Sequence, residues 1–199
     1  MSQSATAVPE EDVLRGRFYE FLSTLLVRAP EKSALMSLSE MHGDTATPLG
    51  QALSHLAEKA AVAHPDTVSD EFDALFIGIT KGELVPYGSY YVTGFLNEKP
   101  LAELRTSMQS LGLERSAEVS EPEDHIASVL EIMGSLIIGR YGTPADMATQ
   151  RRFFETHVAP WATAFFEDLE IAEKGDFYKV VGTIGRQFMA IEKDAFALA

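Results

Sequence analysis

Apolar residues recur at steps of three and four along most of this chain, and this spacing restricts its fold more than any other feature. Such spacing collects side chains on one side of an α-helix, whereas a half-buried β-strand alternates apolar and polar at every second residue. The one strand-like stretch covers residues 87–92, and Gly88 interrupts it. The sequence therefore predicts an all-α protein: one bundle of about eight to ten helices, or two helical subdomains joined by a hinge.

Acidic, proline and glycine residues mark the predicted ends of the helices. Acidic residues at 10–12 favour the start of a first helix through the helix dipole, and Pro30 ends it. The buried face of this helix is predicted to carry Val13, Leu14, Phe18, Phe21, Leu22, Leu25 and Leu26. Later helices are predicted to begin at Thr47-Pro48, Pro65, Pro100 and Thr143-Pro144, with a kink or fresh start at Pro160 and a final helix capped by Asp176.

Polar segments indicate how the chain is divided. Residues 1–9 are predicted to form a disordered tail, so that residues 10–199 make up one helical domain. Residues 113–120, LERSAEVS, form a polar connector between two helical halves. We expect this connector to be either a hinge or a simple loop.

The composition excludes several kinds of partner and site. The chain has 199 residues, 46% of them hydrophobic, which is enough for a real core, and its net charge is −14. That charge repels a phosphate backbone, which argues against nonspecific binding to nucleic acid, whereas a basic partner is compatible with it. The chain has no cysteine, which rules out disulfides, thiolate nucleophiles, iron–sulfur clusters and cysteine zinc sites.

Motifs that would indicate an enzyme are missing. A di-iron bundle needs an acid three residues before a histidine, and none of the five histidines has one. The sequence has no glycine-rich phosphate loop and no nucleophile elbow. We therefore expect a protein that is not an enzyme and has no metal or cofactor of its own. Since the chain shows neither a secretory signal nor a membrane-spanning run, we expect it in the cytoplasm.

Residues 85–94, VPYGSYYVTG, contain three tyrosines and no charge, in a chain of which 23% is charged. Two structural interpretations are a buried connection and an ordinary strand. A functional interpretation is a surface shaped to hold another chain, because tyrosines supply rigid contact area. We expect at least one of Tyr87, Tyr90 and Tyr91 to pack in the core.

The most concentrated polar segment is EPEDHI, residues 121–126. Acids at this place suit the start of a helix, and residues 120–123 match a capping box with proline in the first turn. Asp124 and His125 are less well explained as capping residues. A neutral histidine would be tolerated there and could hydrogen-bond a partner.

The segment FFETHVAPW, residues 153–161, mixes aromatic rings with a histidine. At helical spacing Phe154, His157 and Trp161 share one side. This pattern predicts a buried histidine with a satisfied hydrogen bond among core aromatic residues.

Taken in order, four segments resemble the TorD/DmsD family of redox-enzyme maturation chaperones, over about residues 10–190. They are Glu71 with Leu75-Phe76, PYGSYY at 86–91, EPEDHI at 121–126 and FFETHVAPW at 153–161. The resemblance implies an all-helical, non-enzymatic protein of the cytoplasm. Such a protein binds the twin-arginine signal peptide, and often the body, of an apo-molybdoenzyme and delays export until the molybdopterin cofactor is inserted.

The resemblance also implies a site. The residues that would line a signal-peptide groove are Pro86, Tyr87, Ser89, Tyr90, Glu121, Pro122, Asp124 and His125, with Leu75 and Phe76 as an apolar wall. Asp124 would pair with an arginine of the peptide, and the tyrosines would stack on guanidinium groups.

Two alternatives remain beside this interpretation. One is a NarJ-like assembly factor for a molybdoenzyme subunit that is not exported. The other is a weak GTP-binding protein: the resemblance implies weak binding of guanine nucleotides in some family members, whereas the missing phosphate loop counts against it here. The family also implies either a monomer or a domain-swapped dimer, and the sequence does not name the client enzyme.

Overall fold

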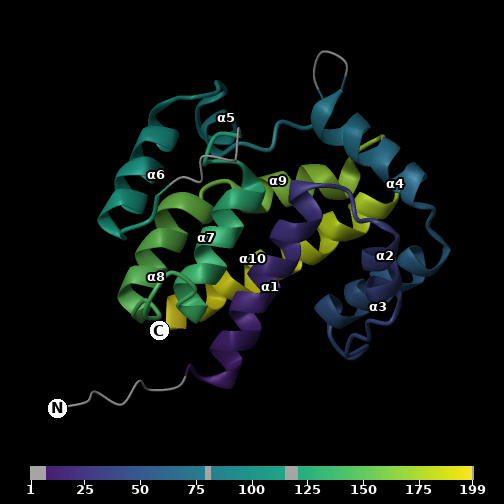
Figure 1. The fold of residues 1–199 in the computed structure, drawn as a ribbon, viewed down its shortest axis with the longest axis horizontal. Helices are drawn as coiled ribbons and strands as arrows, with labels where there is room; N and C mark the ends of the chain where they lie inside the picture. The colour runs from purple at the N-terminus through teal and green to yellow at the C-terminus, as the bar shows by residue number, and fades with distance from the viewer. Residues whose placement is uncertain (1–7, 79–81, 115–120, 199) are drawn as a thin grey trace.

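The structure, a computed structural model, describes residues 8–78, 82–114 and 121–198. These residues form ten α-helices and two π-helical turns, and no strand is found among them. The elements are α1 Glu10–Val27, α2 Lys32–Ser39, α3 Pro48–Val62, α4 Pro65–Phe72, η1 Asp73–Ile77, α5 Gly88–Thr93, α6 Lys99–Ser110, α7 Ile126–Ile138, α8 Met147–Phe153, η2 Phe154–Val158, α9 Ala162–Ile171 and α10 Phe177–Leu198. The predicted all-α fold is confirmed (Figure 1).

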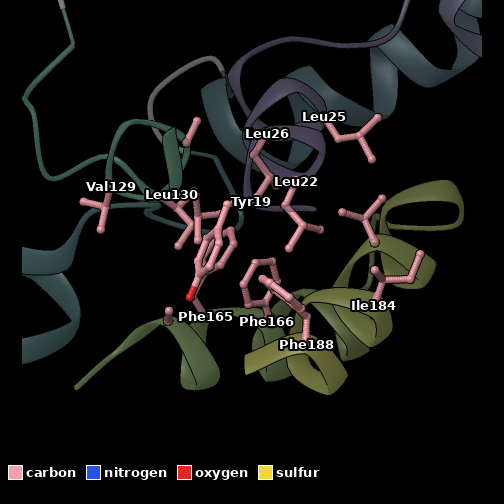
Figure 2. Packing of buried hydrophobic residues seen from close by; sticks show 14 of the residues in the cluster. Tyr19, Leu22, Leu25, Leu26, Val129, Leu130, Phe165, Phe166, Ile184 and Phe188 are labelled. Carbon is pink, nitrogen blue, oxygen red and sulfur yellow. The ribbon is translucent and has the colours of Figure 1, made fainter. Parts of the chain in front are cut away.

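The core lies between α1, α7, α9 and α10. Helix α1 packs along α7, α9 packs along α10, and α3 packs on both α10 and α2 (Figure 1). Figure 2 shows side chains from these helices meeting in one cluster, among them Tyr19, Leu130, Phe166 and Phe188. Because the cluster draws on both ends of the chain, the C-terminal helices are part of the same core as α1.

Glycines allow two of these helix pairs to approach closely. A Cβ on Gly134 of α7 would lie 2.8 Å from the carbonyl oxygen of Gly16 in α1. A Cβ on Gly182 of α10 would lie 2.5 Å from the backbone nitrogen of Glu170 in α9. Both distances are shorter than van der Waals contact, so these crossings require residues without a side chain.

A buried charged network joins α1 to α10. The Arg15 guanidinium donates to both oxygens of Glu192, at 2.8 and 2.9 Å, and the Tyr19 hydroxyl donates to the same carboxylate at 3.0 Å. Glu192 is only 1% exposed, and a buried carboxylate of this kind is stable only when it is paired in this way. The Arg15 guanidinium also lies over the ring of Phe196.

Several predicted helix starts are confirmed. Thr47 caps α3, since its hydroxyl accepts a 3.0 Å hydrogen bond from the backbone N–H of Gly50. Pro65 and Pro100 both stand in the first turn of their helices, where a missing N–H costs nothing. Helix α4 continues through the η1 turn and stops at Gly78, whose φ of 61° favours glycine.

The strand-like interpretation of residues 87–92 is wrong, because α5 occupies Gly88–Thr93. The first N–H groups of this short helix are taken by one residue: Gly88 donates to the Asp124 carbonyl and Ser89 to the Asp124 carboxylate. Only Tyr87, just before the helix, forms a single antiparallel bridge, with His125.

Two other boundaries were not predicted. The helix expected to begin at Thr143-Pro144 begins instead at Met147, where the Asp146 carboxylate caps it by accepting from the Thr149 N–H at 2.8 Å. Helix α2, which follows Pro30, has only eight residues and no side-chain cap, so the sequence carried little signal for it.

The predicted buried face of α1 is partly wrong. Leu14 is 61% exposed, and Phe18 and Phe21 are only partly buried. The face that meets α7 is carried by other residues, including Gly16 and fully buried Tyr19.

The final helix, α10, begins directly after Asp176, as the sequence predicted, but the Asp176 side chain is not its cap. The acceptor is the Glu71 carboxylate from α4, which receives the backbone N–H groups of Asp176 at 2.8 Å, Phe177 at 3.1 Å and Tyr178 at 2.7 Å. The Asp176 carboxylate is bound by Lys59 instead, at 2.5 Å. A carboxylate at a helix N-terminus is stabilised by both the hydrogen bonds and the helix dipole.

Some predictions fall outside the described residues: most of the expected tail, at 1–7, and most of the expected hinge, at 115–120. No helix in the described part of the chain has the length and apolar content needed to cross a membrane. Within the same residues, no group of three or more acidic or histidine side chains could hold a metal ion.

Candidate functional site

An apolar groove of about 490 Å³ opens beside α5. It is lined by Phe76, Ile77, Gly82, Leu84, Val85, Pro86, Tyr87, Tyr90, Gly94, Phe95 and Leu96. Three of the apolar side chains reach well into solvent: Phe95 is 69% exposed, Ile77 60% and Leu96 48%. Large exposed apolar side chains gathered around a hollow are typical of a surface that binds another chain.

The extended segment that forms one wall, residues 82–87, is attached to the fold on two sides. The N–H of Glu83 donates to the Ala74 carbonyl at 3.2 Å, and that of Leu84 to the Leu75 carbonyl at 2.8 Å. The Glu83 carboxylate accepts from the N–H groups of Glu173 at 2.6 Å and Lys174 at 2.9 Å. The wall is therefore fixed to the turn between α9 and α10.

Asp124 holds α5 against the segment 121–126. Its carbonyl accepts from the Gly88 N–H at 2.9 Å, and its carboxylate Oδ2 accepts from the Ser89 N–H at 2.8 Å. The Ile126 N–H in turn donates to the Pro86 carbonyl at 2.8 Å. Asp124 is thus the N-terminal cap of α5, which the sequence did not indicate.

The predicted cap of α7 by residues 120–123 is wrong, because α7 begins at Ile126 and His125 caps it. The Nδ1 atom of His125 accepts from the Ala127 N–H at 3.2 Å, so this nitrogen carries no proton and the imidazole is neutral. Burial lowers the pKa of His125 to about 4, although Glu121 and Asp124 act in the opposite direction. The expectation of a neutral histidine is therefore met, with a backbone partner for its acceptor nitrogen.

The remaining acids of this segment are also bonded. Arg105 of α6 donates to both oxygens of Glu123, at 3.1 Å to Oε1 and at 2.8 Å to Oε2. The Tyr87 hydroxyl donates to the exposed Glu121 carboxylate at the edge of the groove. Burial and this hydrogen bond raise the pKa of Tyr87, so the tyrosine stays protonated at physiological pH.

Two aromatic residues, Trp161 just before α9 and Phe165 within it, pack against α5. The Tyr91 ring lies 5.8 Å from that of Trp161 and 6.0 Å from that of Phe165, and its hydroxyl donates to Asp168 at 2.9 Å. A Cβ on Gly88 would lie 3.0 Å from the Trp161 ring. Tyr91 is therefore the tyrosine of the segment that packs against the core.

His157 is buried, as its segment predicted. Its Nε2 atom lies 2.8 Å from the Ser107 hydroxyl, and its carbonyl accepts from the Trp161 indole N–H at 2.7 Å. Burial lowers the pKa of His157. These contacts give His157 a structural place between α6 and α9.

On the other side of α5 lies a small crevice of about 20 Å³, lined in part by Asp124, Glu103, Val92 and Trp161. Asp124 is 3% exposed, and its second oxygen, Oδ1, has no hydrogen-bond partner among the described residues. A buried carboxylate oxygen without a partner is costly, so this atom is available to a donor that reaches the crevice.

The structure divides the predicted site residues into two groups. Phe76, Pro86, Tyr87 and Tyr90 line the groove. Leu75, Ser89 and Asp124 are buried behind it. Glu121 and His125 lie beside it and contact Tyr87, and the Pro122 carbonyl accepts from the His125 N–H. The apolar residues that sequence reasoning missed are Ile77, Leu84, Val85, Phe95 and Leu96; the Phe-Leu pair after Gly94 was the one visible signal.

Comparisons with known proteins fit this arrangement. A family model described as nitrate reductase delta subunit matches residues 42–167, more than half of the chain. The chaperone protein TorD of Photobacterium profundum is 33% identical over 54% of this chain and 54% of its own length. The TorD of Aliivibrio fischeri is 29% identical over 63% and 62%, and the TorD of Vibrio cholerae is 26% identical over 92% and 82%. The chain thus spans little more than half of the first relative.

A solved structure shares the fold. It is that of a provisionally named redox enzyme maturation protein from Archaeoglobus fulgidus, with a TM-score of 0.55 and 22% identity over 90% of this chain and 94% of that one. At this sequence identity the structural similarity supports only the fold. Together with the family model and the TorD relatives, it confirms the resemblance read from the four segments: the chain belongs to the TorD/DmsD family of redox-enzyme maturation chaperones.

Proposed function

We propose that this protein is a cytoplasmic maturation chaperone for a molybdenum-dependent oxidoreductase, and that it is not itself an enzyme. It binds the twin-arginine leader peptide of the apo-enzyme, which is its client. By holding the leader, it keeps the client bound while the cofactor is inserted. The family membership and the names of the TorD relatives support the role. The groove beside α5 supports the mode of binding.

The observation that carries the proposal is the apolar groove of about 490 Å³ and its exposed rim. Its volume falls in the range of established binding pockets, about 300–1,000 Å³. The apolar stretch of a leader peptide is helix-prone, and an apolar helix face in a hydrophobic groove is a common form of peptide recognition. Each Å² of apolar surface removed from water there contributes about 25 cal/mol.

The two arginines of such a leader need acidic partners near the groove. Glu121 is exposed at its edge, and Asp124 offers the partnerless oxygen Oδ1 at the crevice on the far side of α5. An arginine at the cationic end of a peptide in the groove would pair with Glu121 at its edge, and would reach the Asp124 oxygen only where the crevice of about 20 Å³ opens. The net charge of −14 attracts a cationic peptide at long range and speeds its encounter.

The test is calorimetric titration of the purified protein with a panel of twin-arginine leader peptides, each beside its Arg-Arg→Gln-Gln version. We expect one leader to bind with a Kd in the micromolar range or below, and its Gln-Gln version to bind at least about tenfold more weakly, a loss of about 1.4 kcal/mol. Failure of every leader to bind would refute leader recognition.

A pull-down separates the leader from the body of the client. Full-length client and client without its leader are offered to the immobilised chaperone. We expect loss of the leader to reduce capture strongly. Equal capture of both forms would assign the chain to assembly of a folded subunit, as in the NarJ-like alternative.

A further inference from the structure

We infer that Glu83 is a positioning residue of the groove beside α5. Its carboxylate fixes the first part of the groove wall, residues 82–85, and thereby sets the affinity for the apolar stretch of the leader. The inference rests on the proposed function, because it concerns how the same groove holds its peptide. Glu83 is not among the described residues that line the groove, so it acts through its neighbours Leu84 and Val85, which do.

Two carboxylates bind the turn between α9 and α10. The Glu71 carboxylate, from α4, accepts the three backbone N–H groups of residues 176–178. The Glu83 carboxylate accepts those of residues 173–174, at 2.6 and 2.9 Å. Hydrogen bonds to an ionised acceptor are roughly twice as strong as bonds between neutral groups. Both acids therefore hold the same turn, but Glu71 holds it from a helix and Glu83 from the extended wall.

Glu83 carries the one side chain of residues 82–86, GELVP, that can form a hydrogen bond. The backbone of this segment is bonded to η1 through the N–H groups of Glu83 and Leu84. Its link to the turn between α9 and α10 is made by the Glu83 carboxylate. Removing this carboxylate therefore frees one side of the wall while leaving the bonds to η1 in place.

The last part of the wall is held separately. The Pro86 carbonyl accepts from the Ile126 N–H at 2.8 Å, and Tyr87 forms a bridge with His125. These contacts with segment 121–126 do not involve Glu83. Tyr87 also bonds Glu121, the proposed partner of the leader's arginines at the groove edge. Loss of the Glu83 carboxylate should therefore loosen residues 82–85 and leave the acidic edge in place.

Fixing the wall in the unbound protein favours binding. Leu84 and Val85 line the groove and are both partly exposed, so a peptide can remove more of their apolar surface from water. A segment that moves freely must be ordered when the peptide binds, and this ordering subtracts from the affinity. Because Glu83 orders the wall beforehand, the peptide meets a surface that is already formed.

Calorimetry of the full chain tests the inference. The tightest-binding leader of the panel and its Gln-Gln version are each titrated into wild type, Glu83→Ala and Glu83→Gln. We expect Glu83→Ala to lower the affinity for both peptides by the same factor, about five- to twentyfold, because the wall contacts the apolar stretch that both share. Glu83→Gln removes the same charge but keeps an oxygen that accepts an N–H, and should bind within about threefold of wild type.

Glu71→Ala is the matched control. It removes the other carboxylate from the same turn but leaves the bonds of Glu83 in place, so its leader affinity should equal that of wild type while its stability falls. Hydrogen exchange of the unbound proteins gives the direct readout. The Leu84 amide and those of residues 173–174 should exchange about tenfold faster in Glu83→Ala but not in Glu71→Ala.

Three results would overturn the inference while leader binding by wild type stands. They are wild-type affinity in Glu83→Ala, equal losses in Glu83→Ala and Glu83→Gln, and the same loss of affinity in Glu71→Ala as in Glu83→Ala. The second result would assign the effect to charge, and the third to general stability of the turn. A wild-type protein that binds no leader would refute the proposed function and this inference together.

Discussion

The Asp124 carboxylate accepts a 2.8 Å hydrogen bond from the backbone N–H of Ser89, 35 residues earlier in the chain. This one contact joins the uncharged aromatic segment to the acidic segment EPEDHI. It gives Asp124 a structural role, as the cap of α5, in addition to the proposed role at the leader peptide. The two roles can be separated because an amide oxygen can cap a helix without carrying a charge.

Asp124→Asn should keep α5 in place and lose only the charge. We expect the free energy of unfolding to change little, and affinity for the bound leader to fall about three- to tenfold in calorimetry. Affinity for the Gln-Gln version of the same leader should be unchanged. Asp124→Ala is the comparison: it also removes the cap and should lower stability by about 1 kcal/mol or more.

Equal losses for the Arg-Arg and Gln-Gln peptides with Asp124→Asn would show that the carboxylate does not contact the arginines. Replacing Asp124 and His125 together by alanine is a poor test of binding, since each residue caps a helix. A loss of affinity in that double variant would report partial unfolding as well as lost contacts.

Phe95→Ala should weaken leader binding without weakening the fold. Phe95 lines the groove and is 69% exposed, so truncation removes contact area for the peptide but opens no cavity in the core. We expect affinity to fall about five- to thirtyfold, equivalent to about 1–2 kcal/mol. Calorimetry measures the affinity, and urea unfolding should give the wild-type midpoint.

Ile171→Ala is the control for Phe95, because Ile171 is similarly exposed and lies outside the groove. Its affinity for the leader should equal that of the wild type. If both variants bound normally, the leader would have to bind elsewhere on the molecule.

His125 should make the fold less stable in acid. Its pKa is about 4 in the folded protein and about 6.5 when unfolded, so the unfolded chain takes up the proton first. The stabilisation is complete above about pH 6.5 and is lost as the pH falls toward 4, by up to about 3 kcal/mol. His125→Asn keeps a neutral cap and should flatten the fall of Tm across this window.

His157 provides the comparison for that titration, since burial also lowers its pKa but it caps no helix. The Tm of both wild type and His125→Asn should therefore fall in acid, because both keep His157, and the fall should be smaller in the variant. Identical slopes between pH 6.5 and 4 would mean that His125 takes up its proton equally in the folded and unfolded chains.

Glu71→Ala should destabilise the protein although Glu71 lies near the surface. Its carboxylate accepts three backbone N–H groups at the start of α10, and truncation leaves these donors to water or without a partner. We expect unfolding free energy to fall by about 1–3 kcal/mol in urea titrations. Asp70→Ala, at the exposed neighbour on α4, should change it by less than about 0.5 kcal/mol.

The sequence identified those helices whose first residues are set by neighbouring residues in the chain. Thr47 with Pro48, and the prolines at 65 and 100, fix helix starts through neighbouring residues, and these starts agree with the structure. Helix α5 could not be found in this way, because its first N–H groups are bound by Asp124 from another segment. The same holds for α10, whose cap comes from Glu71.

The candidate site was predicted in part for the same reason. Tyr87 and Tyr90 line the groove, and their segment was recognisable from its lack of charge. The acidic segment looked like a helix cap, and it is one, but Asp124 caps α5 and His125 caps α7. Spacing along one chain cannot tell which helix an acid will reach when that helix is distant in sequence.

The attachment of the groove wall through Glu83 has a consequence during synthesis. The carboxylate binds N–H groups 90 and 91 positions later in the chain, and α5 rests on Trp161 and Phe165. A chain leaving the ribosome presents residues 82–96 long before these partners exist, and such distant contacts form late. Residues 82–96 therefore find these packing partners only when α9 and the start of α10 have emerged, so the groove takes its final form late in synthesis.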